Sequence, residues 1–128
     1  MVVCDAVHAD SATKKTTILG TFSSVFAKEF PATHPLMCLY VCVTNGRGDV
    51  PIRVQLIDPD DDKVLWSEER NAPFKDPCTV VEMGFAIPAV TFDAPGEYRF
   101  QLYASNEFLM ERRILVQQED PVSECNEQ

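Results

Sequence analysis

The chain has 128 residues, of which 45% are hydrophobic and 24% are charged, and its formal net charge is −9. This length suits one domain, and this balance is typical of a globular protein, which argues against wholesale disorder and against a membrane protein. The negative charge repels phosphate groups, so we expect no binding to nucleic acid or to an anionic membrane.

The residue pattern of the N-terminal third of the chain predicts β-strands. Residues 2–8 form the first expected strand, and a second runs over residues 17–30. Within the second strand the apolar residues change parity, which predicts a β-bulge at Ser23 and Ser24. The two prolines of FPATHP then interrupt the pairing, because proline donates no hydrogen bond to a neighbouring strand.

The middle of the chain begins with LMCLYVCV, residues 36–43, which is apolar at every position. The Asn-Gly pair at 45–46 tolerates positive φ and predicts a tight turn into a strand over residues 52–57. A turn at DPDDDK leads into a short strand at 64–66. The polar segment 67–77, SEERNAPFKDP, contains two prolines and predicts a loop.

The C-terminal part predicts three further strands. Residues 81–87 alternate between apolar and small or polar side chains, and the Pro-Gly turn of FDAPGEYRF leads into a second alternating strand. Tyr98 in this motif is similar to the corner tyrosine of immunoglobulin-like sandwiches. A last strand has Met110, Arg112, Ile114 and Val116 on one parity.

These patterns together predict the fold class and the domain organisation. About eight short strands separated by turns favour an all-β protein, an immunoglobulin-like two-sheet antiparallel β-sandwich. We expect residues 1–117 to form a single domain and residues 118–128 to form a flexible, acidic C-terminal tail.

The cysteines and the first residues predict the compartment. Five cysteines are an odd number, and most lie inside apolar segments, where a reduced cysteine behaves as a small hydrophobic residue. The stretch MVVCDAVHAD lacks a basic region and reaches an acidic residue at Asp5, unlike a secretory signal. We therefore expect a cytoplasmic protein.

Four motifs carry a resemblance to a known family. They are CDA at residues 4–6, ILGTF at 18–22, the pairs Phe-Pro and His-Pro within 30–35, and FDAPGEYRF at 92–100. In this order and spacing they resemble an uncharacterised bacterial family of small, stand-alone proteins known only as a domain of unknown function. The resemblance implies a β-sandwich, and it supplies no activity, cofactor or site residue.

The stretch LMCLYVCV is the strongest functional signal in the sequence. If Met37 and the residues of its parity face the core, every residue of the other parity faces outward. An apolar strip left in water invites aggregation, so we expect something to cover it. The predicted interface residues are Leu36, Cys38, Tyr40 and Cys42.

Three kinds of cover are open for this strip. The loop that carries Trp66 and Phe74 could fold across it. A protein partner could bind it, most economically a second copy of the chain related by a two-fold axis. A small apolar ligand is the third alternative.

The acidic turn is a second candidate site. Clustered aspartate oxygens can bind calcium at the rim of a β-sandwich, although the spacing here is not that of an EF-hand loop. The other interpretation is a solvated hairpin turn begun by Asp-Pro. The candidate ligands are Asp58, Asp60, Asp61 and Asp62.

The sequence offers no strong pattern for catalysis. His8 and His34 are the only histidines, and nothing in their spacing places either beside Cys4 or Cys78 as a nucleophile pair would require. We therefore predict no catalytic residues and no cofactor. The expected function is a non-enzymatic protein-interaction or assembly module that forms a homo-oligomer or binds a protein partner. The alternative is a ligand- or calcium-binding sandwich that uses its acidic loops.

Overall fold

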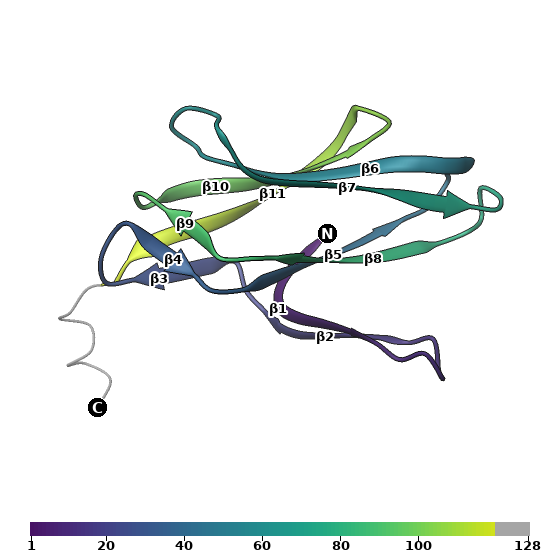
Figure 1. The fold of residues 1–128 in the computed structure, drawn as a ribbon, viewed down its shortest axis with the longest axis horizontal. Coiled ribbons are helices and arrows are strands. Elements are labelled where there is room, and N and C mark those ends of the chain that lie inside the picture. Colours follow the sequence, from purple (N-terminus) through teal and green to yellow (C-terminus); the bar gives the residue numbers. More distant parts are fainter. Residues whose placement is uncertain (120–128) are drawn as a thin grey trace.

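The computed structural model describes residues 1–119, and all regular structure in this range is β-strand. Figure 1 shows two sheets that face each other as layers. No helix within these residues is long and apolar enough to cross a membrane. The strands are β1 (Val2–Ala9), β2 (Thr16–Thr21), β3 (Ser24–Ala27), β4 (Ala32–His34), β5 (Met37–Val43), β6 (Gly48–Ile57), β7 (Val64–Phe74), β8 (Val81–Ile87), β9 (Val90–Phe92), β10 (Gly96–Ala104) and β11 (Glu107–Gln118).

The strand order confirms the predicted all-β sandwich. One layer, sheet A, has the order β2-β1-β5-β8, and the other, sheet B, has the order β3-β11-β10-β6-β7. A small pair, β4-β9, completes the structure. The described residues contain eleven strands where about eight were expected, and their pairings are antiparallel except for that of β3 with β11, which is parallel. The immunoglobulin-like topology stays a prediction.

The segment predicted as one bulged strand is in fact two strands in different sheets. The chain leaves sheet A at Thr21 and joins sheet B at Ser24. Phe22 and Val25 both pack against the core. The core lies on opposite sides of the chain in the two sheets, so a chain that passes from one sheet to the other must bury residues of the other parity. The change of sheet therefore explains the change of parity between Phe22 and Val25.

The predicted loop at 67–77 is mostly strand, because β7 continues to Phe74. Residues directly opposite one another in a sheet share a face, and Arg70 and Glu68 lie opposite the buried Ile52 and Val54 of β6. These two charged side chains therefore point inward at the open side of the sandwich, where they form an ion pair of 2.5 Å. Their polarity concealed the alternation of a strand.

The core lies between the two sheets and is built from apolar side chains. No polar or charged residue among residues 1–119 is buried. The largest fully buried side chains include Tyr98, Phe85, Phe92 and Phe100. The Phe92 and Tyr98 rings meet edge to face with centroids 4.7 Å apart, a favoured arrangement of aromatic pairs.

Tyr98 behaves as the predicted corner tyrosine. Its hydroxyl donates a hydrogen bond of 2.7 Å to the carbonyl of Ala94, four residues upstream. Burial raises the pKa of the Tyr98 phenol above its ordinary value of 10.0. The neutral hydroxyl thus fixes the loop that enters β10.

We expect Tyr98→Phe to lower the free energy of unfolding by roughly 0.5–1.5 kcal/mol, because the ring stays packed while the buried hydrogen bond is lost. Urea unfolding measures the change. Tyr103→Phe is the matched control, since the half-buried Tyr103 hydroxyl donates to the Gln101 side chain rather than to the backbone. Equal losses in the two variants would contradict the role of Tyr98.

The C-terminal strand extends past the predicted end of the domain. β11 includes Gln118, whose side-chain amide donates a hydrogen bond of 3.2 Å to the carbonyl of Lys28. The Glu119 backbone amide donates to the carbonyl of Ala27. The predicted tail therefore does not begin at residue 118, and its remainder, residues 120–128, lies outside the described residues.

Candidate functional site

The strip LMCLYVCV has the orientation that its sequence predicts. Met37, Leu39 and Val41 are fully buried in the core. Leu36, which immediately precedes β5, is 52% exposed, and the β5 residues of the same parity are half-buried or exposed. The predicted interface residues Leu36, Cys38, Tyr40 and Cys42 therefore share the outer side of sheet A.

The segment with Trp66 and Phe74 does not cover this strip. Both residues belong to β7 in the opposite sheet, where Phe74 is only 5% exposed. Trp66 meets the core ring of Phe85 edge to face, with centroids 6.4 Å apart. That proposed cover is wrong, because these aromatic residues pack against the inner side of the sandwich.

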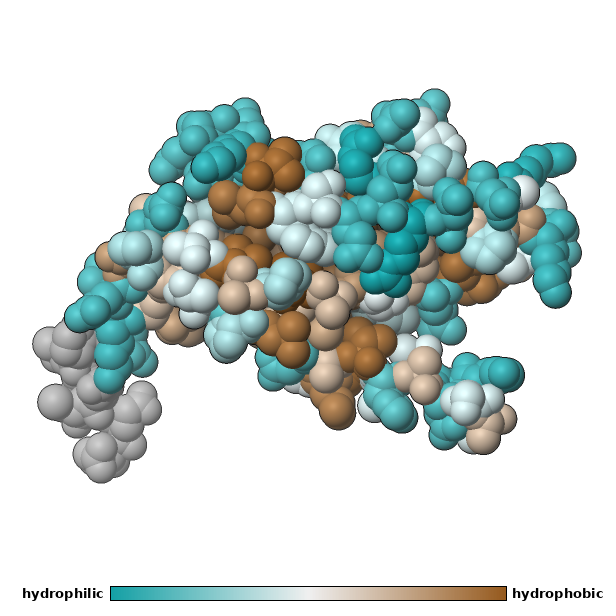
Figure 2. Space-filling model, in the orientation of Figure 1, coloured by the Kyte–Doolittle hydropathy of each residue, from teal (hydrophilic) through white to brown (hydrophobic). Residues whose placement is uncertain are grey.

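The β1–β2 hairpin covers part of the strip instead. Val7 Cγ1 lies 3.4 Å from the position that a Cβ would take at Gly84 on β8. Val7 and Ala9 line a shallow cavity of about 280 Å³ together with Cys38 of β5 and residues of β8. Figure 1 shows the hairpin leaving sheet A on the side away from sheet B, and Figure 2 shows hydrophobic surface around this departure.

Cys4 and Tyr40 are held in their neutral forms on this side of the sheet. Burial raises the pKa of the Cys4 thiol, and the nearby Cys38 adds to the shift. The Tyr40 hydroxyl donates a hydrogen bond to the Glu82 carboxylate, and that bond, followed by burial, raises the pKa of Tyr40. A neutral, buried thiol is a poorer nucleophile than an exposed thiolate.

The far side of the strip leads to an unpaired strand edge. β8 is the outermost strand of sheet A and pairs only with β5. Its sequence, VEMGFAI, contains one charged residue, Glu82, and no proline, lysine or arginine. Val80, immediately before β8, is 58% exposed. Natural proteins commonly protect such edges with charges, prolines or bulges.

The acidic turn has a structural role within the β6–β7 hairpin. Asp58 Oδ1 accepts a hydrogen bond from the Asp60 backbone amide, and Asp61 Oδ1 accepts one from the Lys63 amide. Asp62 has a φ of 56° and forms an ion pair of 2.9 Å with Arg99. Within residues 1–119, no three acidic, histidine or cysteine side chains are placed to hold one metal ion. The calcium hypothesis thus receives no support from this turn.

The two histidines lie apart from the cysteines considered as nucleophiles. His8 is exposed near the end of β1, and Cys78 is exposed in the loop between β7 and β8. No hydrogen bond or ring contact in the described part of the chain joins either histidine to a cysteine. His34 instead contacts Phe22, with ring centroids 5.8 Å apart.

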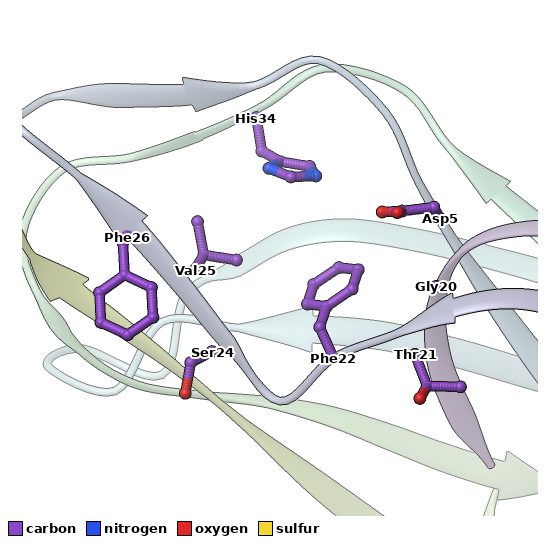
Figure 3. Close-up of a pocket in the computed structure, with 8 residues that line it drawn as sticks. All are labelled: Asp5, Gly20, Thr21, Phe22, Ser24, Val25, Phe26 and His34. Carbon is purple, nitrogen blue, oxygen red and sulfur yellow. The ribbon is translucent and has the colours of Figure 1, made fainter. Parts of the chain in front are cut away.

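A pocket of about 420 Å³ opens where the chain passes from sheet A to sheet B. Figure 3 shows the Phe22 ring pointing into the space between Asp5 and His34. Phe22 is half-buried and packs against the core, so core contacts hold its ring in position. The lining residues are Asp5, Gly20, Thr21, Phe22, Ser24, Val25, Phe26 and His34.

Gly20 gives the carboxylate of Asp5 its place in this pocket. Gly20 has a φ of +67°, and a Cβ at this position would lie 2.4 Å from Asp5 Oδ2. The Asp5 side chain makes no hydrogen bond or ion pair with the other residues of the described range. The pocket therefore presents a free carboxylate beside an aromatic ring.

This pocket is absent from the sites expected from the sequence. Asp5, Gly20, Phe22 and His34 belong to three of the motifs on which the family resemblance rests, but those motifs lie far apart in the chain. The antiparallel pairing of β1 with β2 places Asp5 beside Gly20, and the change of sheet after Thr21 adds Ser24, Val25 and Phe26 to the lining. A glycine and two prolines near the parity change were the available signal for a sharply bent segment.

The comparisons with known proteins give a family without a function. The model of a family of unknown function (DUF6941) matches residues 1–117. No curated protein matches the chain.

Proposed function

This chain belongs to the family of unknown function DUF6941, and since that family offers no activity to inherit, we propose that the protein is a non-enzymatic assembly module that pairs with a second copy of itself along β8. The observation that carries the proposal is the unprotected edge of sheet A. β8 leaves a row of backbone donors and acceptors without a neighbouring strand, which is a template for strand addition.

The other strand edges differ from β8 in ways that disfavour pairing. The β7 edge of sheet B contains Pro73 and the charged run from Glu68 to Arg70. β3 has only four residues, and β2 includes the left-handed backbone of Gly20 as its next-to-last residue. β8 is therefore the most suitable edge for a partner strand among the described residues.

A two-fold axis fits the residues of β8. Antiparallel pairing about Gly84 places Glu82 of each copy opposite Ala86 of the other, so the two carboxylates do not face each other. Two outward residues of the apolar strip, the half-buried Tyr40 and the exposed Cys42, lie on the neighbouring strand β5 beside this edge. The joined strands would form one continuous sheet through both copies.

The compartment belongs to the same proposal. Cys4, Cys38, Cys42 and Cys78 are all free thiols. Free cysteines of this number are usual where glutathione and thioredoxin keep thiols reduced. We place the assembled protein in the cytoplasm on this ground.

Light scattering on a sizing column, with reductant and over a range of concentrations, tests the assembly. We expect the mass of two chains. Ala86→Glu places a carboxylate opposite Glu82 twice in each dimer and should weaken the dimer by about tenfold. Ala86→Lys introduces a side chain of similar size with the opposite charge, and this matched control should retain the dimer.

Two results would contradict the proposal. One is a monomer at every concentration. The other is equal behaviour of the Glu and Lys variants, because the predicted pairing makes their effects opposite in sign. Circular dichroism of each variant shows whether the exposed site tolerates the substitution.

A further inference from the structure

We infer that the pocket lined by Asp5, Phe22 and His34 binds an alkyl-linked cation, a guanidinium or ammonium group, such as the side chain of arginine or lysine. This inference is independent of the assembly proposal. The pocket lies where β2 and β3 meet, at the opposite edge of sheet A from β8. Each proposal can therefore fail without the other.

The charge of the pocket favours a cation. Asp5 is the only carboxylate that lines it, and neither lysine nor arginine is among the lining residues. The Asp5 side chain is exposed to solvent and has no ion-pair partner in residues 1–119, so it is accessible to a ligand. The formal net charge of −9 adds long-range attraction for a positive group.

The Phe22 ring strengthens the preference of the pocket for a cation. The Phe22 ring points into the space between Asp5 and His34 (Figure 3). A cation within about 6 Å of the centre of such a ring is attracted to its face. Because Phe22 packs against the core and against the His34 ring, it does not have to become ordered when the ligand binds.

The rim of the pocket suits the apolar stem of a long basic side chain. Phe26, which lines the pocket, is 61% exposed and offers an apolar surface at its rim. Lysine and arginine pack their methylene groups along apolar surface and keep the charged end near polar groups. A bare metal ion would use neither feature, since it needs several ligating atoms that this pocket does not gather.

Titration followed by ¹H–¹⁵N NMR tests the inference with N-acetylarginine amide as the probe. We expect the amide signals of Gly20 to Phe22 and of His34 to shift, with saturation at probe concentrations of about 1 to 10 mM. N-acetylcitrulline amide, which has nearly the same shape without the charge, should bind at least about tenfold more weakly.

Two substitutions that each remove one negative charge locate the binding site. Asp5→Asn should weaken binding of N-acetylarginine amide by about fivefold or more. Asp49→Asn, an exposed position at the start of β6, removes the same charge and should change the affinity by less than about twofold. Phe22→Leu keeps an apolar side chain without the ring and should also weaken binding.

Each outcome decides the inference. It is wrong if the probe at about 20 mM shifts no signal around the pocket, if the citrulline probe binds as well, or if Asp49→Asn has the effect of Asp5→Asn. A titration with methylguanidinium distinguishes a small free cation from a protein side chain as the natural ligand. Equal affinity for it indicates a small free cation, and tighter binding of the arginine probe indicates a protein side chain. If Phe22→Leu unfolds, the two asparagine variants still decide the inference.

Discussion

Replacing Phe85 with alanine is expected to lower the free energy of unfolding by about 3–5 kcal/mol, the largest effect of any substitution considered for this protein. Phe85 is 1% exposed on the edge strand β8. Its ring meets Trp66 of the opposite sheet, and the Arg70 guanidinium carbon lies 4.3 Å from the ring centre. Alanine would remove both contacts and leave a cavity at the open side of the sandwich.

Urea unfolding of Phe85→Ala measures this loss, and the slope with denaturant shows whether the transition stays two-state. Phe26→Ala removes the same ring from a site that is 61% exposed, and it should change stability by less than about 0.5 kcal/mol. Several protein concentrations are needed, because a dimer is stabilised by mass action. A loss below about 1 kcal/mol for Phe85→Ala would show that this side of the sandwich is loosely packed.

The second large effect is expected at Gly46, where alanine should destabilise the fold by about 1–3 kcal/mol. A Cβ at residue 46 would lie 2.2 Å from Phe74 Cδ2 and 2.6 Å from Phe74 Cγ. Phe74 is 5% exposed and packed in the core, so its ring cannot move aside freely. The glycine therefore makes room for a buried ring.

Gly48→Ala separates packing from backbone strain. Gly48 has a φ of +66° but nothing within 4 Å of its Cβ position, so alanine there should cost only about 1 kcal/mol through backbone conformation. Phe74→Leu should relieve Gly46→Ala and leave Gly48→Ala unchanged, which a double-mutant cycle detects. Equal coupling of Phe74 to both glycines would contradict the packing explanation.

The sequence predicts elements well where one side of a strand is uniformly apolar. The alternation in Met83, Phe85 and Ile87 identified β8. The strip LMCLYVCV is apolar on both parities, so its sequence could state the inward parity only as a condition, and the structure places Met37 and Leu39 inward. At the 45–46 turn the prediction was only half right. Asn45 has a φ of 67°, but Gly46 is not among the residues with positive φ.

The remaining features depend on contacts between distant segments. The continuation of β7 beyond Trp66 was missed, because Glu68 and Arg70 point inward and pair with each other, which a local pattern cannot distinguish from a polar loop. The three-residue strands β4 and β9 are too short to show a period. The pocket depends on the pairing of β1 with β2, which places Asp5 beside Gly20, and on the sheet change after Thr21, which adds Ser24 to Phe26.

The parallel pairing of β3 with β11 has a consequence for the time at which the protein can fold. Residues 24–27 find their partners only at residues 115–118, and β10 needs β11 as one of its two neighbours. Pairings between such distant segments slow folding, because a long loop must close before any contact compensates its entropy. On the ribosome, sheet B can be completed only after residue 118 has left the exit tunnel. Until then the apolar residues of β6 and β10 lack part of their cover, so this interval is when the chain is most exposed to aggregation.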